Sequence, residues 1–149
     1  MERRKLHAAK LRKGRVSIPG QVYLVTTVTK RRRPLFLSFE RARMLVGVLR
    51  ECEQNQLART LAFVVMPDHL HWLMCLEEKR TLSSVVGAVK SISARRFGGG
   101  RRWQPGFHDH ALRKEEDLVS LARYVVANPL RAGLVSRLGD YPHWDAIWL

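Results

Sequence analysis

The segment 60–76 constrains the fold of this chain more than any other stretch. Two apolar runs, TLAFVVM (60–66) and HLHWLMCL (69–76), are separated only by Pro67 and Asp68. Aspartate and proline favour tight turns, and runs rich in β-branched and aromatic residues favour strands. We therefore expect a β-hairpin, and hence an antiparallel sheet around it.

Other strand and helix patterns surround this hairpin in a regular order. The expected elements are a strand over 21–29, a helix over 38–56 begun by Ser38, the two hairpin strands, a helix over 81–97 begun by Thr81, a short strand within 107–113, and a helix over 115–129 ended by Pro129. The order β-α-β-β-α-β with a third helix is typical of a ferredoxin-like (RRM-like) α+β fold, an antiparallel sheet with helices on one face. That fold serves many functions, so function must be argued from a site.

Charge is the unusual part of the composition. The chain has 149 residues, of which 46% are hydrophobic, and a net charge of +14. Its length predicts one domain, and the seven basic residues among the first 20 predict a basic N-terminal arm over 1–20 that leads into a domain over 21–149. A strongly basic surface attracts polyanions, of which nucleic acid is the commonest.

The sequence also bears on location. No apolar run is long enough for a membrane span, and no apolar stretch follows the basic N-terminus as in a signal peptide. Cys52 and Cys75 lack metal-type spacing, so we expect reduced thiols in a cytoplasmic protein.

Two basic segments are candidates for contacting nucleic-acid phosphates. They are Arg12, Lys13 and Arg15 in the arm, and Lys30, Arg31, Arg32 and Arg33 after the first strand. The alternative is that both are solvated charge runs without a partner. A phosphate-binding role predicts that affinity falls with added salt.

The histidines of the hairpin suggest a metal site. Alternate strand residues share a face, so His69 and His71 stand about 7 Å apart at Cα, while Leu70 points into packing. Ordinary packing of two unrelated histidines is the competing interpretation. A second pair with the same spacing, His108 and His110, encloses Asp109, which a strand would turn toward the packing face. The first pair is therefore the preferred ligand pair.

A tyrosine in the last predicted helix is a candidate nucleophile. If Leu118, Leu121, Ala122 and Val125 form the buried stripe, a rotation of about 100° per residue puts Tyr124 and Asn128 together on its flank, one turn apart. Asn128 could equally be a cap at the end of the helix.

Three segments carry a resemblance to a known family. VVMPDHLHWLM, WQPGFHDHALR and YVVANPLRAGLV, in that order, resemble the signature segments of the REP-associated tyrosine transposases, small single-tyrosine members of the HUH superfamily close to insertion-sequence transposases. The resemblance extends over roughly residues 14–145. It implies an endonuclease and strand transferase that recognises DNA hairpins of the REP type, acts on single-stranded DNA and cleaves through a 5′-phosphotyrosine intermediate.

The family's site residues can be carried onto this chain. Its His-hydrophobic-His motif falls on His69, Leu70 and His71, its nucleophile on Tyr124, and the polar third metal ligand on Asn128. The metal would be Mg²⁺ or Mn²⁺, and the protein a monomer or a homodimer. The family commonly has asparagine where this chain has Asp68. This departure keeps both histidines, but it adds a carboxylate that we expect to affect which metal is preferred.

Two other functions remain open on the sequence alone. One is a non-catalytic ferredoxin-like nucleic-acid-binding protein that stacks bases on Trp72, Trp103 or Trp144. The other is a metallonuclease with water as its nucleophile. Only the transposase reaction would leave a covalent protein–DNA adduct.

Overall fold

The computed structural model describes residues 20–147, except for 79 and 114–117. Within these ranges five strands form one sheet in the order β4-β1-β3-β2-β5, with every neighbouring pair antiparallel. The strands are β1 (Val22–Val28), β2 (Ala58–Met66), β3 (His69–Leu76), β4 (His108–Ala111) and β5 (Trp144–Ala146). Arg12, Lys13 and Arg15 of the predicted basic arm lie outside the described residues.

The helices confirm the predicted α+β order. They are α2 (Phe39–Gln54), α3 (Leu82–Arg96), α4 (Leu118–Val126) and α5 (Asn128–Arg131), with short 3-10 helices at Lys30–Arg32, Leu35–Leu37 and Leu138–Asp140. Ser38 and Thr81 cap α2 and α3 as expected, because their side chains accept hydrogen bonds from the amides of Arg41 and Ser84. No helix in the described part of the chain is long and apolar enough to cross a membrane.

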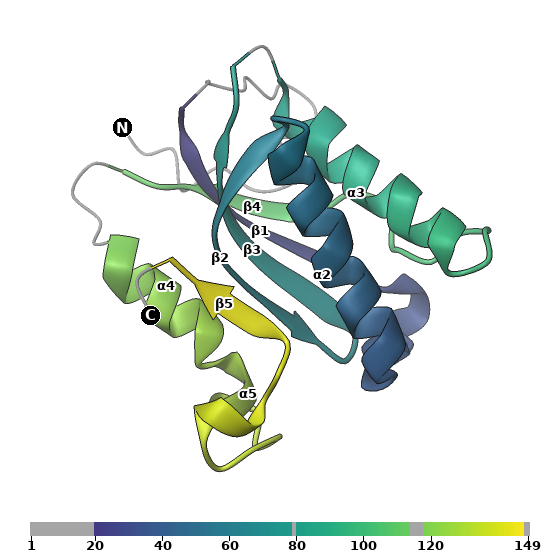
Figure 1. Ribbon diagram of the computed structural model, residues 1–149, viewed down its shortest axis with the longest axis vertical. Helices are drawn as coiled ribbons and strands as arrows, with labels where there is room; N and C mark the ends of the chain where they lie inside the picture. The colour runs from purple at the N-terminus through teal and green to yellow at the C-terminus, as the bar shows by residue number, and fades with distance from the viewer. Residues whose placement is uncertain (1–19, 79, 114–117, 148–149) are drawn as a thin grey trace.

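Helices cover both faces of the sheet, so the expectation of helices on one face is wrong. Figure 1 shows α2 and α3 on one side of the sheet and α4 and α5 on the other. The reason lies in β2, where both alternating sets of side chains are apolar and buried: Phe63 and Val65 face the core under α2 and α3, whereas Ala62 and Val64 belong to clusters on the other face. A sheet that is apolar on both faces needs a cover on each.

The end of the third helix also differs from the prediction. The helix α4 ends at Val126, and Pro129 does not end it but lies buried in the first turn of α5. Proline is tolerated there because the first amides of a helix have no partner within it. The acidic residues 115–117, expected in the first turn of this helix, lie outside the described residues. The C-terminal segment then adds β5 to the edge of β2.

Candidate active site

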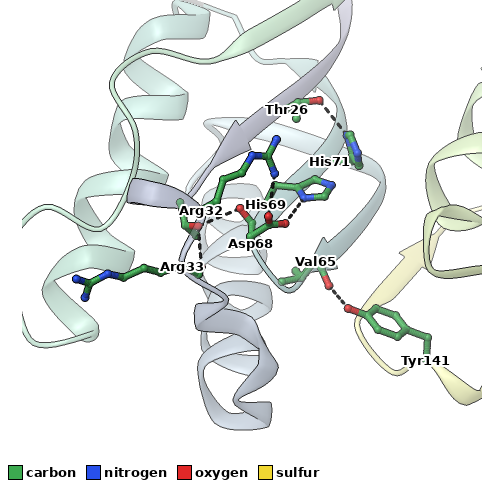
Figure 2. A network of polar contacts seen from close by, with 9 residues as sticks. Thr26, Arg32, Arg33, Val65, Asp68, His69, His71 and Tyr141 are labelled. Atoms are coloured by element: carbon green, nitrogen blue, oxygen red, sulfur yellow. Dashed lines mark hydrogen bonds and ion pairs between the residues drawn. The ribbon is translucent and has the colours of Figure 1, made fainter. Parts of the chain in front are cut away.

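The two hairpin histidines lie side by side on the face of the sheet that α4 covers. His69 pairs with Val28 of β1 and Met66 of β2, while His71 pairs with Thr26 and Val64. Their ring centroids are 4.7 Å apart, with the rings nearly perpendicular. Figure 2 shows both rings on β3, close to the turn that joins it to β2.

The residue between them faces the other way, as predicted. Leu70 is fully buried in the core under α2 and α3. The hairpin therefore separates a packing face from a polar face at this point. The prediction that His69 and His71 share one face is confirmed.

Each histidine has one ring nitrogen engaged, which leaves the other for a ligand. The Nδ1 atom of His69 is 2.7 Å from Asp68 Oδ1, and that of His71 is 2.9 Å from Thr26 Oγ1 (Figure 2). A hydrogen bond at Nδ1 fixes the ring and directs the Nε2 lone pair toward an ion, the arrangement that metal-binding histidines need.

The charge state of His71 also suits a metal ligand. Burial, then the neighbouring His69 and then Arg131, lower the pKa of His71 to about 4. His71 is therefore neutral at neutral pH, the form in which imidazole can donate its lone pair to an ion.

Asp68 links this pair to the basic loop after β1. Its Oδ2 atom lies 2.8 Å from an Nη atom of Arg32. Burial raises the pKa of Asp68, but the hydrogen bonds from His69 and Arg32 outweigh it, so the net shift is downward. The carboxylate is thus held between the His69 imidazole and the loop, where it orients the ring.

The loop that carries Arg32 has an uncommon backbone. Arg31 and Arg32 have φ angles of +56° and +52°, a region that side chains other than glycine and asparagine rarely adopt. Thr29 anchors the loop to the hairpin turn, because its amide donates to the carbonyl of Asp68 at 3.0 Å. Its hydroxyl lies 2.8 Å from the Arg33 carbonyl and 3.1 Å from the Asp68 carbonyl. Backbone strain of this kind is often retained at functional sites.

Tyr124 is the accessible tyrosine of the chain. Its side chain on α4 is 57% exposed, whereas Tyr23 is buried, and the hydroxyl of Tyr141 donates to the Val65 carbonyl. Burial raises the pKa of Tyr141 to about 12, which makes it a poor nucleophile at neutral pH.

The helix α4 is docked beside the two histidines. Val125, next to Tyr124, clusters with Val64 and Met66, the β2 residues paired with His71 and His69. The predicted nucleophile and the predicted ligand pair of one chain are thus brought to the same face of the sheet.

Asn128 does not share a helix with Tyr124, so the expectation that one helix carries both is wrong. It is the first residue of α5, and its Nδ2 atom donates to the Val125 carbonyl at 2.8 Å. This contact is the capping interaction that was the alternative to a ligand role. Because it uses the amide nitrogen, the amide oxygen is still available as a donor to an ion, and the ligand role stays a prediction.

The second histidine pair occupies the edge strand β4. His108 and His110 are paired with Thr26 and Leu24, so they lie on the same face as His71 but two strands away, roughly 10 Å between Cα positions. Asp109 is in register with Val25, on the opposite face, as the sequence predicted. The preference for His69 and His71 rests on their ring contact and their two orienting partners.

Sequence reasoning missed several residues that lie near these side chains. Thr26 lies 45 positions from His71, and only the register of β1 on β3 brings them together. Arg131 stacks on Tyr124, with the guanidinium carbon 3.8 Å from the ring centroid. Arg101 and Arg102 join Lys30, Arg33 and Leu35 around a pocket of about 80 Å³. Thr26 and the arginines of this pocket become neighbours only through tertiary packing, whereas Arg131 lies in the segment YVVANPLRAGLV, seven positions after Tyr124.

Two of the three tryptophans considered above as stacking platforms are buried. Trp72 and Trp103 are buried in the core under α2 and α3, where their indole nitrogens donate to Thr60 and Ser93. Trp144 is partly buried and donates to the Leu138 carbonyl. Base stacking on Trp72 or Trp103 would require the core to open.

The residues present fit a divalent metal. Among the described residues, no three His, Cys, Asp or Glu side chains gather as one ligand set. The two Nε2 atoms therefore need a third ligand of another type, and an amide oxygen such as that of Asn128 is suitable. Phosphate oxygens of a nucleic acid would suit the remaining positions.

Comparison with known proteins gives a consistent match. The family described as "Transposase IS200 like" matches residues 18–127. The REP-associated tyrosine transposase of Escherichia coli K12 is 28% identical over 129 residues, which are 86% of this chain and 78% of that protein. A solved structure of a REP-associated tyrosine transposase bound to a REP hairpin is 27% identical, with a TM-score of 0.76 over 87% of this chain and 79% of that one.

Proposed function

Because this chain belongs to the family of IS200-like transposases, we propose that it is a metal-dependent single-stranded DNA endonuclease and strand transferase that recognises REP-type hairpins. The observation that carries the proposal is the accessible Tyr124 on a helix that docks beside His69 and His71. The structure of a relative bound to a REP hairpin supports the choice of DNA.

The chain's own residues supply most of the chemistry. His69 and His71 would hold Mg²⁺ or Mn²⁺ through Nε2, with Asn128 as third protein ligand, while Asp68 and Thr26 keep the two rings in place. When bound, the ion polarises the scissile phosphate and offsets charge on its oxygens. The pKa of His71, about 4, keeps that ring unprotonated at neutral pH.

The proposed covalent step exchanges one phosphate ester for another. The phenolic oxygen of Tyr124 forms a bond to phosphorus as the bond from phosphorus to O3′ breaks. The phenol proton passes to solvent, and the leaving O3′ takes up a proton to become a hydroxyl. The product is a 5′-phosphotyrosine and a free 3′-hydroxyl. Because the ester is retained, a 3′-hydroxyl can later attack it and rejoin a strand.

One gel separates this function from its two alternatives. The protein is incubated with Mn²⁺ and a 3′-end-labelled REP hairpin oligonucleotide carrying single-stranded flanks, and the products are run under denaturing conditions. The proposal expects label that migrates with the protein. Cleaved DNA without such an adduct would indicate a hydrolytic nuclease, and uncleaved DNA would indicate a binding protein.

We propose that the loop after β1 binds the DNA backbone. Lys30 and Arg33 line the basic pocket with Arg101 and Arg102, and Arg31 is exposed beside them. Arg32 is partly committed to Asp68, so its neighbours are the better phosphate ligands. Arg12, Lys13 and Arg15 would add contacts from the arm.

The double variant Lys30→Gln/Arg33→Gln should bind the hairpin with a shallower salt dependence. Each lost phosphate contact lowers the slope of log K against log salt by roughly 0.7–0.9, so we expect a decrease of about 1.5. Fluorescence anisotropy at several salt concentrations measures it. The matched control Arg50→Gln removes an exposed charge at the cavity between α2 and β5. Equal slopes for the double variant and the wild type would show that the loop does not contact the DNA phosphates.

Asn128→Ala should raise the Mn²⁺ concentration needed for half-maximal cleavage, because it removes an oxygen ligand. It should also lower stability by about 1 kcal/mol, since the contact with the Val125 carbonyl is lost. Asn128→Asp is the matched control, since it loses the same donor but keeps an oxygen. A loss of stability in both variants with an unchanged Mn²⁺ requirement would leave Asn128 as a cap only.

A further inference from the structure

Arg131 lies directly against the predicted nucleophile. Its guanidinium stacks on the Tyr124 ring at 3.8 Å, and one Nη atom donates to the Tyr124 carbonyl at 2.7 Å. One cation thus lies against the face of the phenol ring.

The charge of Arg131 is not neutralised within the described part of the chain. Arg131 is exposed and forms no ion pair there with a carboxylate. A guanidinium has five N–H donors in a planar fork, and the carbonyl of Tyr124 takes only one of its two Nη groups. The remaining donors suit an anion with two acceptor oxygens, such as a phosphodiester.

A purely structural role would explain only part of this arrangement. A basic side chain that bonds a carbonyl near a helix end is a common stabilising contact. It does not require the guanidinium to lie over an exposed tyrosine, since α4 is already held to the sheet by Val125. The ring and the guanidinium instead form one surface, and a phosphate at the phenolic oxygen would lie within reach of both.

We propose that Arg131 is a catalytic residue that binds a non-bridging oxygen of the scissile phosphate and stabilises the negative charge that develops as Tyr124 attacks. This inference rests on the proposed function and adds to it a role for a residue seven positions after the nucleophile. Preorganised donors at developing charge are among the largest contributions to catalysis.

The first test is kinetic. With the wild-type cleavage position mapped on the REP hairpin oligonucleotide, Arg131→Ala should slow adduct formation at saturating DNA by roughly 100-fold. Arg131→Lys, which keeps the charge but not the fork, should be intermediate, and millimolar guanidinium should partly restore Arg131→Ala. Arg123→Ala, which removes the same charge one residue before Tyr124, should stay within about threefold of wild type.

The second test needs neither metal nor turnover. Binding is measured for Tyr124→Phe and for Tyr124→Phe/Arg131→Ala, with the scissile phosphate either normal or replaced by an uncharged methylphosphonate. Neutralising that phosphate should weaken Tyr124→Phe about 10-fold and the double variant less than twofold. A methylphosphonate several nucleotides away should weaken both proteins equally.

The outcomes separate the two proposals. Adduct formation by Arg131→Ala within threefold of wild type would overturn the role of Arg131 while leaving the transposase function intact. A slow variant that neither guanidinium nor lysine restores, with equal methylphosphonate effects in both proteins, would make Arg131 structural only. Absence of an adduct with the wild-type protein would overturn the proposed function itself, and this inference with it.

Discussion

Tyr124→Phe should abolish the covalent protein–DNA adduct while the protein still folds and binds the hairpin. Removal of a catalytic nucleophile costs on the order of 10⁴-fold or more in rate. The fold should tolerate the change, because the side chain is 57% exposed and its hydroxyl makes no hydrogen bond within the described residues. A phenyl ring can also keep the stacking contact with Arg131. Stability should therefore change by less than about 0.5 kcal/mol.

Tyr141→Phe is the matched control for that experiment. It also removes one phenolic hydroxyl, but this hydroxyl donates to the Val65 carbonyl. The control should therefore lose about 1 kcal/mol of stability and retain the adduct. The measurement is a denaturing gel of labelled hairpin with each variant, alongside thermal unfolding. An adduct that persists in Tyr124→Phe, or disappears in Tyr141→Phe alone, would place the nucleophile elsewhere.

Local signals in the sequence accounted for most of the sheet. The turn at Pro67 and Asp68 and the caps at Ser38 and Thr81 are short-range features, and the structure has all of them where they were predicted. The alternation that placed His69 and His71 on one face follows from strand geometry alone. These features depend on neighbours within a few residues, so one sequence is enough to find them.

The errors and omissions arose where distant segments meet. The sequence alone suggested one helical layer, whereas burial of both faces of β2 requires two. The break between α4 and α5 separates Asn128 from the helix of Tyr124. Thr26 reaches His71 only through the pairing of β1 with β3. No local pattern encodes such contacts.

The histidine substitutions test the metal site itself. His69→Gln and His71→Gln should each weaken Mn²⁺ binding by more than the roughly 10–100-fold that loss of an orienting partner costs, because a direct ligand is removed. Cleavage at fixed Mn²⁺ should fall with it. Isothermal titration with Mn²⁺ on the metal-free protein measures the binding, and the labelled hairpin measures the cleavage.

His108→Gln and His110→Gln are the matched controls, since they alter a pair with the same spacing on the same face of the sheet. We expect both to bind Mn²⁺ like the wild type. The reason lies in the first pair: its ring centroids are 4.7 Å apart and each ring has its Nδ1 atom held, by Asp68 or by Thr26, so both Nε2 atoms are available to one ion. Thr26→Val should therefore weaken Mn²⁺ binding about 10-fold by freeing the ring of His71. If His108→Gln or His110→Gln abolished Mn²⁺ binding while the His69 and His71 variants retained it, the ion would belong to β4 and the geometry of the hairpin pair would need another explanation.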